Sequence, residues 1–319
     1  MKIVKLEAAF KNYIWGGTKL RDIYEKNCNF NKVAESWELS THKDGQSVIA
    51  QGEFKGITLN EYIEIQGRKI LGNNALKFEN FPVLIKFIDA KNPLSVQVHP
   101  SDEYALKVEK EYGKTEMWYV MECDKGSSLY FGVNKEISKE DFAKKINDNT
   151  VEEVLNKVEV NKGDVFFIEA GTIHAIGAGI MICEIQQNSN TTYRVYDYGR
   201  VGDDGNPREL HVQKALDVSN FSPTIIESNN KSTEEIQGGQ KIELASCQYF
   251  TAEKYNVDSE MNLFADLNSF VSIVILEGSG EIIGDENSVK FVAGDSIFVP
   301  ADLGVFTVKG ECQLIKTTV

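Results

Sequence analysis

The sequence is short of positive charge, and it has no long apolar run. Lysine and arginine number 34 against 48 aspartates and glutamates, so the formal net charge is −14. A general nucleic-acid binder needs a basic face that neutralises phosphates, and this composition excludes it. No apolar run reaches the roughly 18 residues of a membrane-spanning helix. The N-terminal segment carries Lys5 and Glu7 where a secretory signal needs unbroken apolar residues, which predicts a cytoplasmic protein.

Cysteine and histidine are also scarce. The five cysteines are widely spaced, odd in number and free of any C-x-x-C pair. This pattern argues against a disulfide framework or a cysteine zinc site, and it favours buried reduced thiols. The four histidines are His42, His99, His174 and His211, so any histidine-based site must draw on them.

Most apolar segments are short and rich in Val, Ile and Phe, which is typical of strands. They lie at 81–90, 94–100, 116–123, 164–170, 180–186, 270–278 and 288–300. Many short strands joined by glycine turns predict a mainly β protein of barrels or double-sheet jelly rolls. Capping patterns at Thr58-x-x-Glu61, Ser138-x-x-Asp141 and Thr150-x-x-Glu153 predict a few helices that decorate this core.

A weak internal repeat indicates two related β units. The segment GDVFFIEAGTIH at 163–174 aligns without gaps to GDSIFVPADLGV at 294–305, an offset of 294 − 163 = 131 residues. The copies differ near their ends, where His174 of the first corresponds to Val305 of the second.

The repeat and a polar segment together predict the domain boundary. Residues 219–241 are rich in Ser, Asn and Gly, which is typical of a linker. We therefore expect a metal-binding domain with helical insertions at 1–225. A C-terminal β-barrel at 226–319 is expected to lack metal ligands.

Four polar residues on predicted strands suggest a metal site. Gln97 and His99 are two residues apart in a strand, so their side chains share a face. Buried polar groups cost free energy unless they are satisfied. Glu116 opens another strand, and His174 follows a glycine turn. Each residue alone is weak evidence, but together they form a ligand set that suits Zn²⁺ or Fe²⁺ with open coordination positions.

The motifs around these residues resemble a known family. Residues 163–174 resemble the second cupin motif, with Glu169 where cupins usually carry proline. The segments 13–17, 35–38, 93–100, 113–119, 170–175 and 184–198 are similar to the type I mannose-6-phosphate isomerases in their short bacterial form. LSVQVHP combined with YRVYDY is specific to that family, whereas the C-terminal third shows only general barrel features.

The resemblance implies a fold of two cupin-type jelly-roll β-barrels and an aldose–ketose isomerase. Such an enzyme interconverts D-mannose 6-phosphate and D-fructose 6-phosphate by zinc-assisted proton transfer through an enediol. The matching residues are His99, Glu116, His174 and Gln97 as ligands of one Zn²⁺ per chain, Arg194, Lys114 and Glu184 as catalytic residues, and Ser95 and Lys86 as phosphate-binding residues.

The chemistry supports these residue types. The substrate's carbonyl oxygen becomes negative as the α-proton leaves, and a metal ion or a guanidinium stabilises that charge. A phosphate carries nearly two negative charges at neutral pH, so a protein at −14 needs a locally positive pocket. The proton-transferring base stays open between Glu184, Lys114 and a metal-bound water.

Two other functions stay open at the level of sequence. One is a non-enzymatic, metal-containing sugar-binding cupin, although a neutral-sugar binder would not need Arg194 and Lys114. The other is an Fe-dependent cupin oxygenase, because the ligand set does not exclude Fe²⁺. We expect a small sugar phosphate as the partner, with neither nucleic acid nor membrane, and a monomer or a homodimer.

Overall fold

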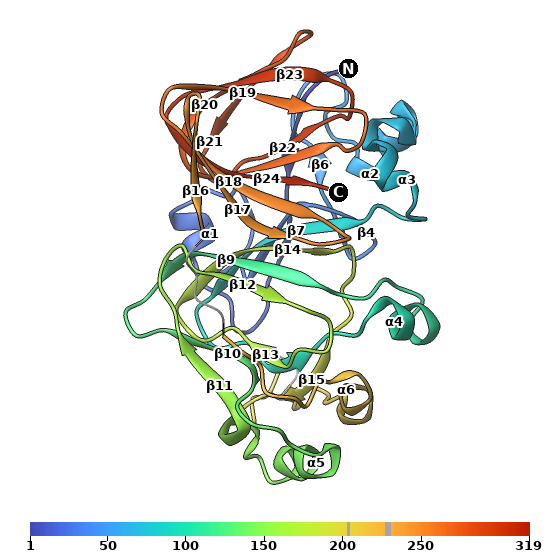
Figure 1. Ribbon diagram of the computed structural model, residues 1–319, viewed down its shortest axis with the longest axis vertical. Helices are drawn as coiled ribbons and strands as arrows, with labels where there is room; N and C mark the ends of the chain where they lie inside the picture. The colour runs from blue at the N-terminus through green and yellow to red at the C-terminus, as the bar shows by residue number, and fades with distance from the viewer. Residues whose placement is uncertain (203–204, 227–230) are drawn as a thin grey trace.

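The computed structural model describes residues 1–202, 205–226 and 231–319, and it is mainly β, as predicted. Figure 1 shows the strands stacked in layers, with the C-terminal strands at one end of the molecule. All strand pairs in these layers are antiparallel. No helix in the described ranges is long and apolar enough to cross a membrane. The five cysteines are unpaired thiols, as expected from their spacing, but only Cys183 and Cys312 are buried and the other three are partly exposed.

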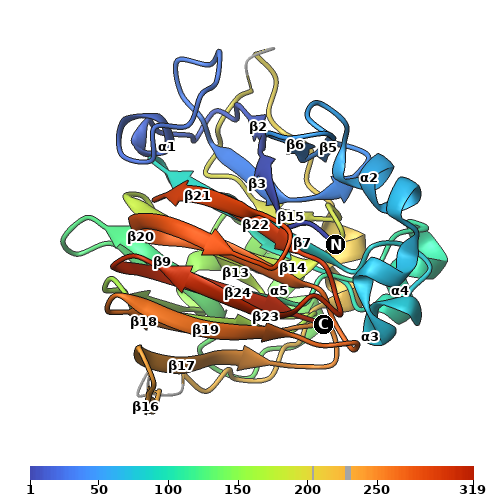
Figure 2. The same ribbon diagram turned by 90° about the horizontal axis from the view of Figure 1, so that it is seen from above.

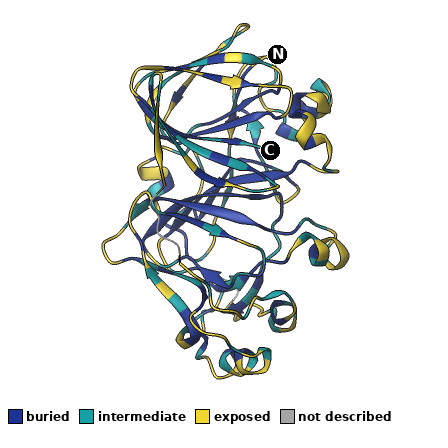
Figure 3. Ribbon diagram, in the orientation of Figure 1, coloured by how far each residue is buried: buried dark blue, intermediate teal, exposed yellow. Residues whose placement is uncertain are grey.

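The middle layer positions the site. It runs in the order β12 (Val165–Ile168), β9 (Glu116–Cys123), β14 (Ile180–Gln187), β7 (Val83–Ala90), β3 (Glu35–Leu39) and β2 (Ala9–Lys11). Every residue of β3, β7 and β14 is buried, because layers cover both faces (Figure 3). Strands covered on both sides need apolar residues at consecutive positions, which explains their continuous hydrophobic runs.

A second layer faces the polar side of the middle one. It contains β11 (Leu155–Glu159), β10 (Ser128–Val133), β13 (His174–Ala175), β8 (Val96–Val98) and β15 (Tyr193–Tyr196). Helices α5 (Lys139–Asn147) and α6 (Val212–Val218) pack their apolar side chains on its outer face. Between these two layers lies the candidate site.

The third layer holds the C-terminal strands and part of the N-terminus. Its path is β16 (Thr233–Ile236), β17 (Gly239–Ser246), β18 (Thr251–Val257), β24 (Cys312–Thr318), β20 (Val271–Ile283), β22 (Ser296–Val299), β1 (Val4–Glu7) and β6 (Val48–Ile49). Strands β19 (Glu260–Ala265), β21 (Ser288–Val292) and β23 (Gly304–Lys309) join this path through β20 and cover the apolar core of the C-terminal unit from the other side. Figure 2 shows these strands lying over β9 and β14 of the middle layer.

The remaining elements are short. They are α1 (Lys19–Asp22), the hairpin β4 (Thr41–His42) and β5 (Gly45–Gln46), α2 (Leu59–Gln66), α3 (Asn73–Leu76), α4 (Asp102–Val108), and the 3₁₀ turns η1 (Arg68–Leu71) and η2 (Val151–Val154).

Two of the three helix predictions are confirmed. Thr58 and Glu61 form the predicted capping box at the start of α2, and the Ser138 side chain caps α5. The third is wrong, because residues 151–154 form only a 3₁₀ turn and the chain then enters β11. Pairing of β11 with β10 overrides the helical spacing of the apolar residues there.

The prediction of two closed barrels is not confirmed. Within the described residues the layers are stacked sheets with free edge strands, such as β2 and β12 of the middle layer. The fold is that of a sandwich of antiparallel sheets, in which facing layers bury a common core.

The internal repeat is confirmed as a repeated turn. Gly163 donates its N–H to Val120 at 2.8 Å, and Gly294 donates to Ile275 at 2.8 Å. Both glycines have φ near +90°, at 93° and 90°, a conformation that favours glycine. Glu116 pairs with Ile168, and Val271 pairs with Val299. Because Ile168 and Val299 are equivalent in the repeat, Val271 stands at the position of Glu116.

The repeat breaks down before its last residue. Val305, which the sequence aligns with His174, is 57% exposed, and Phe306 points into the core instead. A shift of one residue in a strand moves a side chain to the other face, and this explains the exchange.

The N-terminus belongs partly to the C-terminal layer. Strand β1 pairs with β22, with Lys5 opposite Ile297, and β6 pairs with β1. The boundary predicted at 225/226 therefore does not separate all the strands of the two units. Part of the predicted linker, residues 227–230, lies outside the described residues.

Candidate functional site

Three of the predicted ligands meet in a buried cluster. His99 follows β8, Glu116 opens β9 and His174 opens β13. One ligand atom from each lies within 4.8 Å of the others, and all three residues are at most 1% exposed. The strand order causes this meeting, since β13 pairs with β8 and both face β9 of the middle layer.

Backbone carbonyls orient both imidazoles. His99 Nδ1 lies 2.9 Å from the Thr191 carbonyl oxygen, and His174 Nδ1 lies 2.8 Å from that of Thr172. Each Nδ1 therefore carries the donated proton, and each Nε2 offers a lone pair. The Nε2 atoms of His99 and His174 lie 3.7 and 3.4 Å from the Glu116 carboxylate. Burial lowers the pKa of His174 to about 4, so its imidazole is neutral.

These residues fit a divalent metal ion. Within the described chain, Glu116 Oε1 and His174 Nε2 are buried without a hydrogen-bond partner. Burial and the charge of Glu184 raise the pKa of Glu116, although Lys114 opposes the shift. A bound cation would compensate the carboxylate and accept both unpartnered atoms, and the carbonyl-oriented imidazoles are typical of metal ligands.

Gln97 lies beside this cluster on β8. It pairs in register with His174 on one side and with Arg194 of β15 on the other. Its side chain also lines the neighbouring cavity. The predicted amide ligand is therefore at the boundary between the buried cluster and the cavity.

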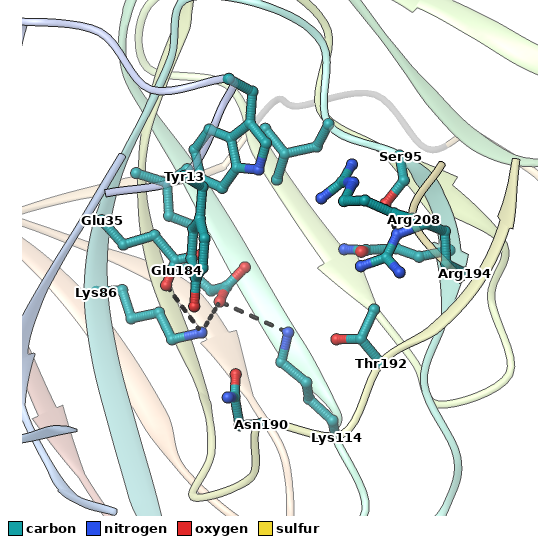
Figure 4. Close-up of a pocket in the computed structure, with 14 residues that line it drawn as sticks. Tyr13, Glu35, Lys86, Ser95, Lys114, Glu184, Asn190, Thr192, Arg194 and Arg208 are labelled. Atoms are coloured by element: carbon teal, nitrogen blue, oxygen red, sulfur yellow. Dashed lines mark hydrogen bonds and ion pairs between the residues drawn. The ribbon is translucent and has the colours of Figure 1, made fainter. Parts of the chain in front are cut away.

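A cavity of about 270 Å³ adjoins the cluster (Figure 4). Its lining residues are Tyr13, Trp15, Glu35, Lys86, Ile88, Leu94, Ser95, Gln97, Lys114, Glu184, Asn190, Thr192, Arg194 and Arg208. Six of the nine residues predicted from the sequence line it directly, and the other three form the buried cluster. Polar groups dominate the wall, as expected of a site for a polar ligand.

One side of the cavity carries a chain of alternating charges. Lys86 Nζ lies 3.8 Å from Glu35 and 3.3 Å from Glu184. Lys114 Nζ lies 3.7 Å from Glu184 and 2.7 Å from Glu116, which links the cavity to the cluster. Figure 4 shows the two lysines converging on Glu184.

The charges around Glu184 keep it ionised. Burial alone would raise its pKa, but the ammonium groups of Lys114 and Lys86 outweigh burial and lower it. Trp118 Nε1 also donates a hydrogen bond to Glu184 at 3.0 Å. The carboxylate is thus a fixed, negatively charged group on the cavity wall.

The opposite side gathers guanidinium groups (Figure 4). Arg194 Nε donates to Ser95 Oγ at 3.3 Å, and its Nη1 donates to the Glu209 carbonyl at 2.8 Å. Burial and the nearby charge of Arg208 lower the pKa of Arg194, yet an arginine stays charged in proteins. Two cations beside a hydroxyl form a site for an anion.

Sequence reasoning missed Arg208 and Glu35 as cavity residues. Arg208 lies in a polar segment without a motif, and Asp197 holds it in place through a 2.7 Å bond to Nε. The Asp197 carboxylate also binds Arg200, so it braces arginines and does not line the cavity. Glu35 lies within the segment 35–38, which resembles the family. Because it is two residues from Trp37 in a strand, the two side chains share a face, and this could have indicated a polar group there.

The fold and the site together define a class of protein. This is a protein of stacked antiparallel sheets with a buried His₂–carboxylate cluster. A cavity adjoins the cluster, with paired lysines and glutamates on one side and arginines on the other. Two family models match the chain: "Phosphomannose isomerase type I, catalytic domain" at residues 3–126 and "Mannose-6-phosphate isomerase, cupin domain" at 240–319.

Curated relatives agree with these models. The chain is 39% identical to the mannose-6-phosphate isomerase ManA of Bacillus subtilis, over 96% of this chain and 95% of the relative. It is 35% identical to the mannose-6-phosphate isomerase of Streptococcus mutans, over 98% and 96%. The chain belongs to the type I mannose-6-phosphate isomerase family.

Solved structures support the same fold. The mannose 6-phosphate isomerase of Bacillus subtilis superposes with a TM-score of 0.91 at 34% identity, with both chains fully covered. The apo enzyme of Salmonella typhimurium gives 0.77 at 18% identity, covering 99% of each chain, which shows a shared fold.

Proposed function

We propose that this protein is an aldose–ketose isomerase that interconverts D-mannose 6-phosphate and D-fructose 6-phosphate with one Zn²⁺ per chain. One observation carries the proposal: a buried His₂–carboxylate cluster touches a cavity that has a guanidinium on one side and a charged carboxylate on the other. An isomerase of this kind needs both a proton acceptor and cationic groups that stabilise an enediolate.

The metal would be held by His99, Glu116, His174 and Gln97. When bound, it would act as a Lewis acid toward the substrate's carbonyl oxygen. Histidine and carboxylate ligands suit Zn²⁺, although the same donors also bind other divalent ions. A metal binds histidine as the neutral imidazole and glutamate as the ionised carboxylate, and these are the forms that the cluster would offer.

Proton transfer falls to Lys114 and Glu184. Both lie on the cavity wall next to the cluster, and Glu184 is kept ionised by its lysine neighbours. A carboxylate next to an ammonium can accept the proton from one of the two reacting substrate carbons. The carboxylate–ammonium pair can then return it to the neighbouring carbon. Arg194, across the cavity, is placed to stabilise the oxygen that becomes negative.

The substrate's phosphate would bind at the guanidinium side. Ser95 and Arg208 line this part of the cavity beside Arg194, and arginines match phosphate geometry well. Lys86, the other residue predicted to bind phosphate, lies between Glu35 and Glu184, and their charges already balance its own. Ser95 therefore suits the predicted role better than Lys86 does.

The C-terminal unit, with a boundary near 225, is proposed to bind no metal. Val271 and Phe306 stand where the first unit has Glu116 and an inward imidazole, and neither can ligate a metal. A cytoplasmic location and a monomeric or dimeric state stay predictions.

A coupled assay tests the proposal. Purified protein should form fructose 6-phosphate from mannose 6-phosphate, lose this activity to a chelator and regain it with Zn²⁺. His174→Ala should bind no metal and show no turnover, because the ligand set would be incomplete. If metal-loaded wild-type protein converts no mannose 6-phosphate, the proposal is wrong.

A further inference from the structure

The loop between β14 and β15 touches both parts of the site. Its Thr191 carbonyl accepts the hydrogen bond from His99 Nδ1 at 2.9 Å, which orients that imidazole. The neighbouring side chains of Asn190 and Thr192 line the cavity. The position of this loop, residues 188–192, therefore fixes one candidate ligand and one stretch of cavity wall.

Groups on the outer side of the loop hold it in place. Thr191 Oγ1 donates to Glu111 at 3.4 Å, and the backbone N–H of Asn190 also donates to Glu111. Asn190 Nδ2 donates to Asp44 in the β4–β5 hairpin at 2.8 Å. All three contacts are made by the same two residues of the loop, Asn190 and Thr191.

Glu111 is itself fixed by the hairpin. Lys43 Nζ lies 2.5 Å from Glu111 Oε1, and His42 Nε2 lies 3.6 Å from Oε2. His42 Nδ1 accepts the N–H of Asp44 at 3.1 Å, so a neutral His42 carries its proton on the nitrogen that faces Glu111. The Glu111 side chain is 19% exposed, and its carboxylate contacts both the loop and the hairpin.

We propose that Glu111 is a positioning residue that acts on the metal site through the loop 188–192. It holds Thr191 so that its carbonyl meets His99 Nδ1, and this keeps His99 Nε2 directed at Glu116. The inference rests on the metal site of the proposed function. Partners behind metal ligands commonly change affinity by about 10–100-fold when they are removed.

Glu111→Gln tests this role, and Glu109→Gln is a matched control. Glu109 also follows α4 and is partly buried, but its carboxylate binds Tyr193 of β15 at 2.8 Å and Lys214 at 2.7 Å. Within the described part of the chain, its carboxylate makes no hydrogen bond with the loop 188–192. The measurement is Zn²⁺ affinity, by competition with a chromophoric chelator, together with thermal melting.

Glu111→Gln should bind Zn²⁺ about tenfold more weakly, whereas Glu109→Gln should stay close to wild type. At saturating Zn²⁺ the kcat of Glu111→Gln should largely recover, because the ligands themselves are intact. If Glu111 acted in folding alone, the variant would melt at a lower temperature. It would not combine weaker Zn²⁺ binding with a kcat that recovers at saturating Zn²⁺.

Thr191→Val supplies a second variant in case Glu111→Gln does not fold. It removes only the hydroxyl that bonds Glu111 and keeps the carbonyl, so it should weaken Zn²⁺ binding in the same direction. Wild-type affinity in whichever of these variants folds, or an equal loss in Glu109→Gln, would overturn the inference. Wild-type protein that binds Zn²⁺ but does not isomerise would instead overturn the proposed function alone.

Discussion

Single side chains divide the cavity into two chemically distinct sides. Glu184 and Lys114 lie on the side that continues into the buried cluster, and Arg194 lies on the side with Ser95. A substrate between them would meet a proton acceptor on one face and a cation on the other. This separation matters because acid–base groups and oxyanion stabilisers act on different atoms of the same substrate.

Arg194→Ala tests the cationic side. Loss of one stabilising donor at a developing oxyanion commonly costs about 10²–10³-fold in kcat, and we expect an effect of that size. The metal should stay bound, since Arg194 is not a candidate ligand, and elemental analysis of the variant checks this. A change in KM with wild-type kcat would mean that Arg194 only binds the ground state.

The sequence could predict the candidate ligand cluster but not all of the cavity. Gln97, His99 and His174 carry recognisable spacing and turn motifs, so their meeting could be expected. Arg208 could not, because it lies in a polar segment without a motif and a contact with Asp197 holds it beside the cavity. Motifs report local chemistry, whereas a side chain that a residue of another segment holds in place leaves no motif of its own.

At the level of elements, Asp197 braces the segment that follows β15. Its carboxylate binds both Arg200 and Arg208, and Arg200 in turn donates to the Pro93 carbonyl. Burial would raise the pKa of Asp197, but hydrogen bonds from Arg208 and Arg200 outweigh it and lower the pKa. The strand end, the loop near Pro93 and Arg208 are thereby tied to one carboxylate.

Asp197→Asn should lower stability at neutral pH and raise KM for the sugar phosphate. Because the folded-state pKa is depressed, the stabilisation by Asp197 is present above the unfolded pKa of about 3.9 and is lost as pH falls through the folded pKa. The stability gap between wild type and variant should therefore shrink below about pH 4. Denaturant melts across pH 3–7 measure it, and a gap independent of pH would contradict this account.

Elements also show where patterns mislead. Val151, Val154 and Val158 have helical spacing, yet only the first two lie in a 3₁₀ turn and Val158 pairs with Leu129 of β10. The strong caps at Thr58 and Ser138 predicted helices correctly because their hydrogen bonds are local. Strand pairing across the chain decides the weaker case.

At the scale of the whole molecule, a buried ion pair links the N-terminal segment to both units. Lys26 Nζ lies 2.7 Å from the Glu38 carboxylate on β3 and also donates to the Gly294 carbonyl, at the repeated turn of the C-terminal layer. The Glu38 side chain is 1% exposed and that of Lys26 is 12% exposed. Burial raises the pKa of Glu38, while Lys26 favours its charged form.

Lys26→Met should destabilise the whole protein, because it leaves the Glu38 carboxylate buried without its cation. Removing one partner of a buried pair costs about 3–5 kcal/mol, whereas replacing both by apolar groups is often neutral. Lys26→Met combined with Glu38→Leu should therefore recover much of the loss. Lys2→Met, which breaks an exposed pair with Glu53, is the control and should change the free energy of unfolding by less than about 1 kcal/mol. Denaturant unfolding measures both variants. If the transition of Lys26→Met shifts by no more than that of Lys2→Met, this pair does not join the two units.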